Sequence, residues 1–128
     1  MSRKVLIVED ADVCTATLEI ALVRIPGLMV EFASTAEKAL ERLSFGDISA
    51  MITDIHLPRM DGFELIEQVR AHPDLAHLPI LVISGDSDPQ TPNRLKSLGV
   101  DAYFPKPYSP AEVRQKLEHL IYAYKRVV

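Results

Sequence analysis

Five polar residues of this chain stand at or shortly after the ends of short apolar runs: Glu9, Asp10, Asp54, Ser84 and Lys106. Three carboxylates close together repel one another, and a hard divalent cation such as Mg²⁺, which prefers oxygen ligands, would remove that repulsion. A lysine and a hydroxyl group beside them would suit a phosphoryl group, whose oxygens need positive charge and hydrogen-bond donors. If the fold brings the five together, their types predict phosphoryl chemistry at a magnesium site.

The elements that would have to position these residues are five short strands, each followed by a helix. Apolar runs typical of strands buried on both faces occupy 4–8, 28–32, 48–53, 80–84 and 102–104. This alternation predicts a parallel, doubly wound α/β sheet with helices on both faces, a three-layer sandwich. In such a sheet the functional site lies beyond the carboxyl ends of the strands. Each polar residue alone also fits an ordinary structural role, so their joint placement at those ends carries the hypothesis.

Capping residues and prolines predict where the helices begin. Asp12 is expected to cap the first helix, and either Ser34 or Thr35 the second. Pro89 and Pro92 can stand only in or before the first turn of the fourth helix, because an interior proline costs roughly 3 kcal/mol. We therefore expect the fourth helix to start late and to be short.

Length and composition exclude several classes of protein. The 128 residues are the size of one domain, so we expect a single domain over 1–128. A 48% apolar content argues against disorder, and no apolar run approaches the ~18 residues that cross a bilayer. The net charge of −4 argues against a nucleic-acid-binding surface, and the lone Cys14 permits no internal disulfide. We expect a cytoplasmic protein that binds neither nucleic acid nor membrane.

From about Lys4 to Tyr124 the sequence resembles the receiver domain of two-component response regulators. The matching pieces are V-L-I-V-E-D at 5–10, D-I-H-L-P-R-M-D-G at 54–62, I-S-G at 83–85 and K-P at 106–107. The resemblance implies a flavodoxin-like (βα)5 fold with strand order 2-1-3-4-5. It also implies that Asp54 is the phosphoacceptor, and that Mg²⁺ is held by Glu9, Asp10, Asp54 and the backbone carbonyl of His56.

The same resemblance assigns roles around the phosphoryl group. Ser84 and Lys106 would contact its oxygens, and the N–H of Gly85 would face it. Ser84 and Tyr103 would form the switch, the aromatic ring turning inward once the hydroxyl group is drawn to the phosphoryl group. The peptide bond between Lys106 and Pro107 is expected to be cis.

Two further side chains are implied to tune the hydrolysis of the phosphorylated state. They are His56 and Asp86, which stand two residues after Asp54 and Ser84, respectively. In receivers these positions flank the path of the attacking water. We expect the bulky imidazole of His56 to shield the phosphoryl group.

The implied function is phosphorylation-dependent signalling. A histidine kinase or a histidine phosphotransfer protein would pass a phosphoryl group to Asp54. The surface formed by the fourth helix, fifth strand and fifth helix would then signal to a downstream protein partner. Such a protein catalyses only its own phosphorylation and dephosphorylation and is not a turnover enzyme. It would be a monomer or a phosphorylation-dependent dimer.

Alternatives remain beside this interpretation. The chain is either a stand-alone receiver or a receiver excised from a longer multidomain regulator or hybrid kinase. A Mg²⁺-dependent phosphohydrolase with Asp54 as nucleophile usually needs an acid two residues later, where His56 stands. An FMN-binding flavodoxin shares the architecture, but the first loop here is acidic where phosphate binding favours glycines and hydroxyl groups.

Overall fold

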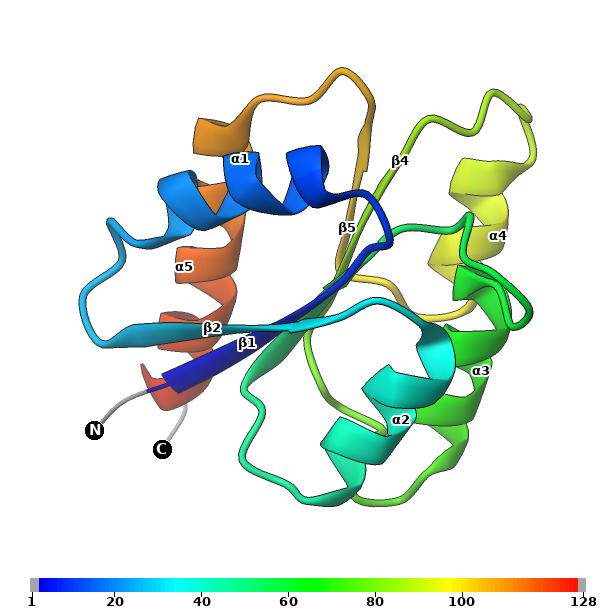
Figure 1. Ribbon diagram of the computed structural model, residues 1–128. Coiled ribbons are helices and arrows are strands. Elements are labelled where there is room, and N and C mark those ends of the chain that lie inside the picture. The colour runs from blue at the N-terminus through cyan, green and yellow to red at the C-terminus, as the bar shows by residue number, and fades with distance from the viewer. Residues whose placement is uncertain (1–2, 127–128) are drawn as a thin grey trace.

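The computed structural model describes residues 3–126, without the side chains of residues 12–14 and 123–126. Its core is a parallel sheet whose strands lie in the order β2-β1-β3-β4-β5 (Figure 1). This confirms the predicted α/β fold and the strand order 2-1-3-4-5. The strands are β1 (Arg3–Val8), β2 (Leu28–Ala33), β3 (Ala50–Thr53), β4 (Ile80–Ser84) and β5 (Ala102–Pro105).

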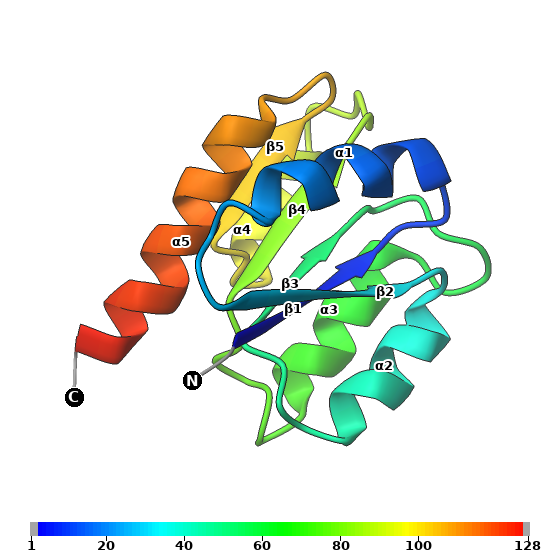
Figure 2. The same ribbon diagram turned by 60° about the vertical axis from the view of Figure 1, so that its left-hand side comes forward.

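Helices cover both faces of the sheet. Helices α1 and α5 lie on one face, and α2, α3 and α4 lie on the other (Figures 1 and 2). Among the described residues, no helix has the length and apolar character needed to span a bilayer. The helices are α1 (Asp12–Leu22), α2 (Ala36–Ser44), α3 (Gly62–Ala71), α4 (Thr91–Ser97) and α5 (Pro110–Arg126).

The sheet divides the hydrophobic core into two halves, because successive side chains of a strand point to opposite faces. In β1, Val5 and Ile7 belong to the half under α1 and α5. Leu6 and Val8 belong to the half under α2, α3 and α4. Burying each such side chain stabilises the fold by about 1.5–3 kcal/mol. Strand β1 is therefore fixed from both sides, which also fixes the residues that follow it.

The helix starts agree with the prediction in two cases and differ in one. The hydroxyl group of Thr35 caps α2 by accepting a hydrogen bond from the N–H of Lys38 at 3.1 Å. Helix α4 is seven residues long and carries Pro92 in its first turn. The expectation that Asp12 caps α1 was wrong, because Asp12 is the first helical residue and Ala11 occupies the N-cap position.

Strand β3 is shorter than predicted, since it begins at Ala50 and not at Ile48. Asp47 lies in the left-handed region with φ +80°, which turns the chain before the strand. The N–H of Ser49 then donates a hydrogen bond of 2.7 Å to the carbonyl of Lys4. The apolar residue Ile48 thus belongs to the loop and not to the sheet.

Candidate functional site

Two buried carboxylates meet at the carboxyl ends of neighbouring strands. Glu9 follows β1, Asp54 follows β3, and each is only 5% exposed. Strands β1 and β3 pair with Val8 opposite Thr53, and the N–H of Asp54 donates to the carbonyl of Val8 at 3.1 Å. The strand register therefore sets the two carboxylates side by side.

Lys106 reaches the same place from the end of β5. Its Nζ lies 2.9 Å from Oδ2 of Asp54 and 3.9 Å from Oε1 of Glu9. The N–H of Lys106 donates to the carbonyl of Ser84 at 2.8 Å, so Pro105, which has no N–H, does not end the pairing with β4. The peptide bond between Lys106 and Pro107 is cis, as the resemblance implied.

Burial and mutual contact give the two carboxyl groups different protonation states. Burial, followed by the hydrogen bond with Asp54 and the charge of Asp54, raises the pKa of Glu9 to about 8. Burial also favours a higher pKa for Asp54, but hydrogen bonds from Glu9, Lys106 and the N–H of His56 together lower that pKa below its ordinary value. Near neutral pH the metal-free site thus holds a protonated Glu9 and an ionised Asp54, which is the form that can act as a nucleophile.

The donor set fits a small, hard cation. Oε2 of Glu9 is buried and has no hydrogen-bond partner among the described residues. Mg²⁺ accepts one or two carboxylates and keeps several waters, so Glu9 and Asp54 would suffice as side-chain ligands. The carbonyl of His56 is an oxygen donor in the loop that follows Asp54. A cation there would supply the partner that Oε2 lacks.

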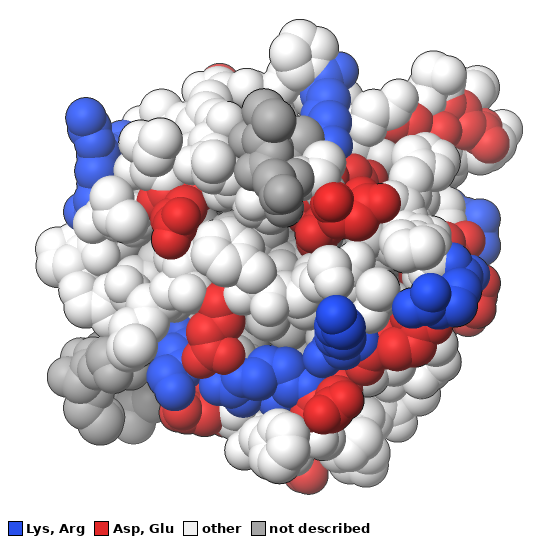
Figure 3. All heavy atoms as spheres, viewed as in Figure 1, with Lys and Arg blue, Asp and Glu red and all other residues white. Residues whose placement is uncertain are grey.

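Asp10 lies at the rim of the site and is not buried with the other two carboxylates. It is exposed, and within the described residues no three His, Cys, Asp or Glu side chains form a group that could hold a metal. The reason is that Glu9 occupies the inward position after β1, which leaves the next residue at the rim. Acidic side chains are visible on this face where the carboxyl end of β1 reaches the surface, beside α1 (Figure 3).

The protonation of Glu9 predicts how metal-free stability depends on pH. In the fold its pKa is raised from 4.5 to about 8. Between these values the unfolded chain loses this proton while the folded protein keeps it, so unfolding becomes easier as the pH rises. We expect the free energy of unfolding in EDTA to fall from pH 5 to pH 8, and Glu9→Gln to reduce that fall.

Urea denaturation in EDTA at pH 5, 6.5 and 8 measures this dependence. The lowered pKa of Asp54 acts below its ordinary value of 3.8, outside this window. Glu41→Gln, an exposed change on α2, serves as the control and should follow the native protein. Equal slopes for Glu9→Gln and the native protein would contradict the assigned protonation.

The end of β4 carries a second group of predicted residues. Ser84 is fully buried, and its Oγ accepts a hydrogen bond from the N–H of Asp86 at 3.3 Å. The carbonyl of Asp86 accepts a hydrogen bond from the Tyr103 hydroxyl group at 3.4 Å. Tyr103 is half-buried, and burial, followed by the charges of Asp86 and Asp54, raises its pKa. Gly85, between Ser84 and Asp86, is exposed, and a Cβ added to it would have no other atom within 4 Å.

Sequence analysis missed one residue of this group, Thr91. Its side chain is 3% exposed, and its hydroxyl group donates to Oδ2 of Asp86 at 2.7 Å. This bond, followed by one from the N–H of Asp88, lowers the pKa of Asp86. The only sequence signal was a threonine before a proline at a helix start, which does not reveal a partner five residues earlier.

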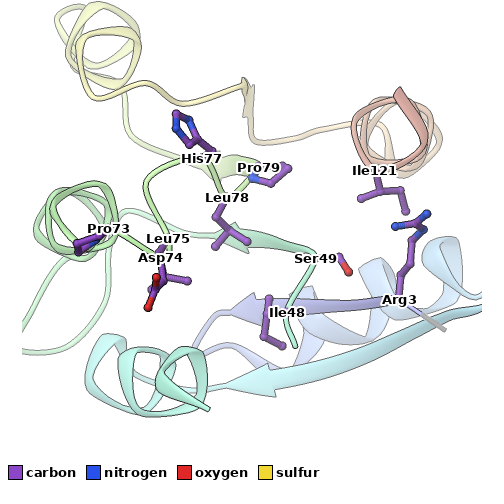
Figure 4. Close-up of a pocket in the computed structure, with 10 residues that line it drawn as sticks. All are labelled: Arg3, Ile48, Ser49, Pro73, Asp74, Leu75, His77, Leu78, Pro79 and Ile121. Carbon is purple, nitrogen blue, oxygen red and sulfur yellow. The ribbon is translucent and has the colours of Figure 1, made fainter. Parts of the chain in front are cut away.

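Two concave regions lie away from this site. A cavity of about 310 Å³ at the amino ends of the strands is lined by Arg3, Ser49, Leu78 and Ile121 among others (Figure 4). A groove of about 300 Å³ between α1 and α5 is lined by Ile20, Arg114 and their neighbours. Neither contains a predicted site residue, so the chemistry lies at the opposite end of the sheet from the cavity.

Comparison with known proteins agrees with this geometry. A sequence model of the response regulator receiver domain matches residues 5–118. Chemotaxis protein CheY-3 of Vibrio cholerae is 29% identical over 93% of this chain and 92% of that protein. The gliding motility regulatory protein of Myxococcus xanthus is 33% identical over 80% of this chain, but the matched part is only 13% of that protein. This chain thus resembles both a protein of its own size and one segment of a much longer one.

Solved structures give the same result. A response regulator receiver protein from Pseudomonas putida superposes with a TM-score of 0.84 at 30% identity, over 91% of this chain and 96% of that one. The receiver domain of the sensor histidine kinase PA1611 from Pseudomonas aeruginosa, solved with a magnesium ion coordinated in its active site cleft, superposes with a TM-score of 0.83. The latter is 23% identical over 94% of this chain and 98% of that one, and shows likeness of fold.

Proposed function

Because the chain belongs to the response regulator receiver domain family, we propose that Asp54 accepts a phosphoryl group from a phosphohistidine. The donor would be a histidine kinase or a histidine phosphotransfer protein. The observation that carries the proposal is the Asp54 carboxylate, which is buried, held ionised, and contacted by Nζ of Lys106 at 2.9 Å and by the N–H of His56 at 3.1 Å. A carboxylate in this state is ready to attack phosphorus.

In the transfer step a carboxylate oxygen of Asp54 forms a bond to phosphorus while the bond from phosphorus to the donor nitrogen breaks. The product is an acyl phosphate, and the leaving imidazole keeps the electron pair. The ammonium group of Lys106 would compensate the charge on the phosphoryl oxygens, and the Ser84 hydroxyl group and the Gly85 N–H would donate hydrogen bonds to them. Such a reaction depends on positioning more than on covalent help from the protein.

The cofactor proposed for this site is Mg²⁺. Glu9, Asp54 and the carbonyl of His56 would hold it, with Asp10 at the rim binding it directly or through water. Bound there, the ion would supply positive charge for the phosphoryl oxygens. Two observations support Mg²⁺ at this place. Oε2 of Glu9 is buried without a hydrogen-bond partner among the described residues, and the buried carboxylates of Glu9 and Asp54 lie together beside Lys106.

The family is a signalling module and not a class of turnover enzymes. We propose that the output lies at the surface of α4, β5 and α5, because Asp86 connects Ser84 of the site to Tyr103 of β5 and to Thr91 of α4. The chain would act in the cytoplasm as a single receiver domain over 1–128, either alone or within a longer regulator. The family match favours this function over a phosphohydrolase, and the histidine two residues after Asp54 agrees with it.

Phosphorylation by a small acyl phosphate tests the proposed function. With Mg²⁺ present, the intact mass should rise by one phosphoryl group, and hydroxylamine should remove it, because an acyl phosphate is attacked by that nucleophile. EDTA should prevent the reaction. A label that resists hydroxylamine, or that forms equally well in EDTA, would contradict the proposal.

The lifetime of the phosphorylated state should depend on His56. His56 is exposed and its backbone N–H donates to Asp54, whereas the carboxylate of Asp86 accepts hydrogen bonds from Thr91 and Asp88. We expect His56→Asn to lose the phosphoryl group about threefold faster, a change of less than about 1 kcal/mol in the barrier. His77→Asn, at the other end of the sheet, is the control and should decay as the native protein does.

Following decay by intact mass after removal of the phosphodonor gives these rates. A His56→Asn variant that decays at the native rate or more slowly would mean that the imidazole does not shield the phosphoryl group.

A further inference from the structure

Asp86 joins the predicted phosphoryl site to two other elements. Its N–H donates to Oγ of Ser84, and its carbonyl accepts from the hydroxyl group of Tyr103 on β5. Its carboxylate accepts from the hydroxyl group of Thr91, the first residue of α4, and from the N–H of Asp88. A displacement of Asp86 would therefore disturb its hydrogen bonds with Ser84, with Tyr103 and with Thr91 of α4.

The bond to Thr91 is the shortest that Asp86 makes among the hydrogen bonds of the described residues, at 2.7 Å. A hydrogen bond to an ionised carboxylate is also stronger than one between neutral groups. The Ser84 and Tyr103 bonds to the same residue measure 3.3 and 3.4 Å. Of the contacts that hold Asp86, the one with Thr91 is thus the strongest by geometry and charge.

The packing of α4 against the rest of the protein holds Thr91 in place. It is 3% exposed, and Leu95, one turn later in α4, is 1% exposed. The guanidinium carbon of Arg94 lies 3.7 Å from the centre of the Phe63 ring, which ties α4 to α3. The N-cap residue Gln90 makes no side-chain capping bond. The loop between β4 and α4 is therefore held at its beginning by Ser84 and at its end by Thr91.

We infer that Thr91 is a positioning residue of the switch, whose hydroxyl group holds Asp86, and with it Tyr103, in the unphosphorylated arrangement. The inference rests on the proposed function and names a residue that sets how easily the site responds. Movement of Oγ of Ser84 toward a phosphoryl group would take it from the N–H of Asp86. The bond to Thr91 holds Asp86 in place against this movement, so its loss would favour the responding conformation.

The test uses Thr91→Val, which keeps the shape of the side chain and removes the hydroxyl group, and Thr91→Ser, which keeps the hydroxyl group. Each protein is labelled with fluorotyrosine, and fluorine NMR reports on the four tyrosines, with Tyr103→Phe assigning the signal of interest. Beryllofluoride with Mg²⁺ serves as the phosphoryl mimic. Asp86→Asn, which keeps the size of the side chain and removes its charge, provides a second variant.

Without beryllofluoride, the Tyr103 signal of Thr91→Val should move toward the position that the native protein reaches at saturation. The half-saturating beryllofluoride concentration should fall about five- to tenfold, as expected for a lost charge-assisted hydrogen bond. Thr91→Ser should behave like the native protein, and Asp86→Asn should move in the same direction as Thr91→Val.

A Thr91→Val protein that matches the native protein in both measurements overturns the inference. Equal shifts in Thr91→Val and Thr91→Ser also overturn it, because they would assign the effect to packing and not to the hydroxyl group. Should Thr91→Val fail to fold, Asp86→Asn decides by the same criteria. Failure of the proposed function is distinguishable, because native Tyr103 would then not respond to beryllofluoride, or Asp54→Ala would respond as well as the native protein.

Discussion

Replacing Asp54 by asparagine should abolish phosphoryl incorporation, to at least about a hundredfold below the native level, because an amide lacks the nucleophilic oxygen that forms an acyl phosphate. Asparagine keeps the size of the side chain and one acceptor oxygen, which can take the hydrogen bond of either Lys106 or the N–H of His56, since these two bonds end on different oxygens of Asp54. The variant should therefore remain folded. Intact mass after incubation with a small acyl phosphate and Mg²⁺ measures the loss.

Asp61→Asn is the matched control for this substitution. Asp61 lies in the same loop, and its carboxylate caps α3 by accepting from the N–H of Glu64 at 2.9 Å, a role that asparagine also fills. This variant should incorporate phosphoryl groups as the native protein does. Incorporation by Asp54→Asn at a comparable level would place the acceptor elsewhere.

Gly62→Ala should be strongly destabilising. A Cβ at this position would overlap the carbonyl oxygen of Asp54 and lie 2.7 Å from Cα of Ile55, and both are backbone atoms that cannot rotate away. The N–H of Gly62 also donates to the carbonyl of Ile55 at 2.7 Å, so the close approach is part of the turn. We expect a loss of about 2–4 kcal/mol in the free energy of unfolding.

Urea denaturation with Gly85→Ala as the control isolates this effect. No atom lies within 4 Å of a Cβ built on Gly85, so that variant should lose far less stability. Gly62→Ala should also shift the backbone of Asp54 and so slow phosphorylation in whatever fraction stays folded. A Gly62→Ala protein as stable as Gly85→Ala would show that the turn can open without cost.

The meeting of Asp54 and Lys106 followed from the sequence because it depends on topology alone. Residues at the carboxyl ends of parallel strands share one edge of the sheet, whatever their distance along the chain. These two are 2.9 Å apart although 52 residues separate them. The burial of Val5–Val8 on both faces followed equally from their continuous apolar character.

Details that depend on the path of a loop could not be predicted from the sequence. Glu9 and Asp10 are both acidic and both come after β1, yet one is buried and the other exposed. The pleat at the end of β1 decides which of the two side chains points inward, and the residue type alone does not reveal that direction. The partner of the Thr91 hydroxyl group likewise depends on how the segment from Gly85 to Gln90 folds back, which is set by hydrogen bonds within that segment.

The position of β1 inside the sheet has a consequence for synthesis of the protein. Strand β1 pairs with β2 on one side and β3 on the other, with Val5 opposite both Val30 and Ala50. A chain that emerges from the ribosome in order presents β1 and β2 well before β3, so one edge of β1 stays unpaired in the interval. An apolar strand with an open edge is a template for association with other chains. The pace of translation between β2 and β3 therefore sets how long the strand that leads to Glu9 is open to aggregation.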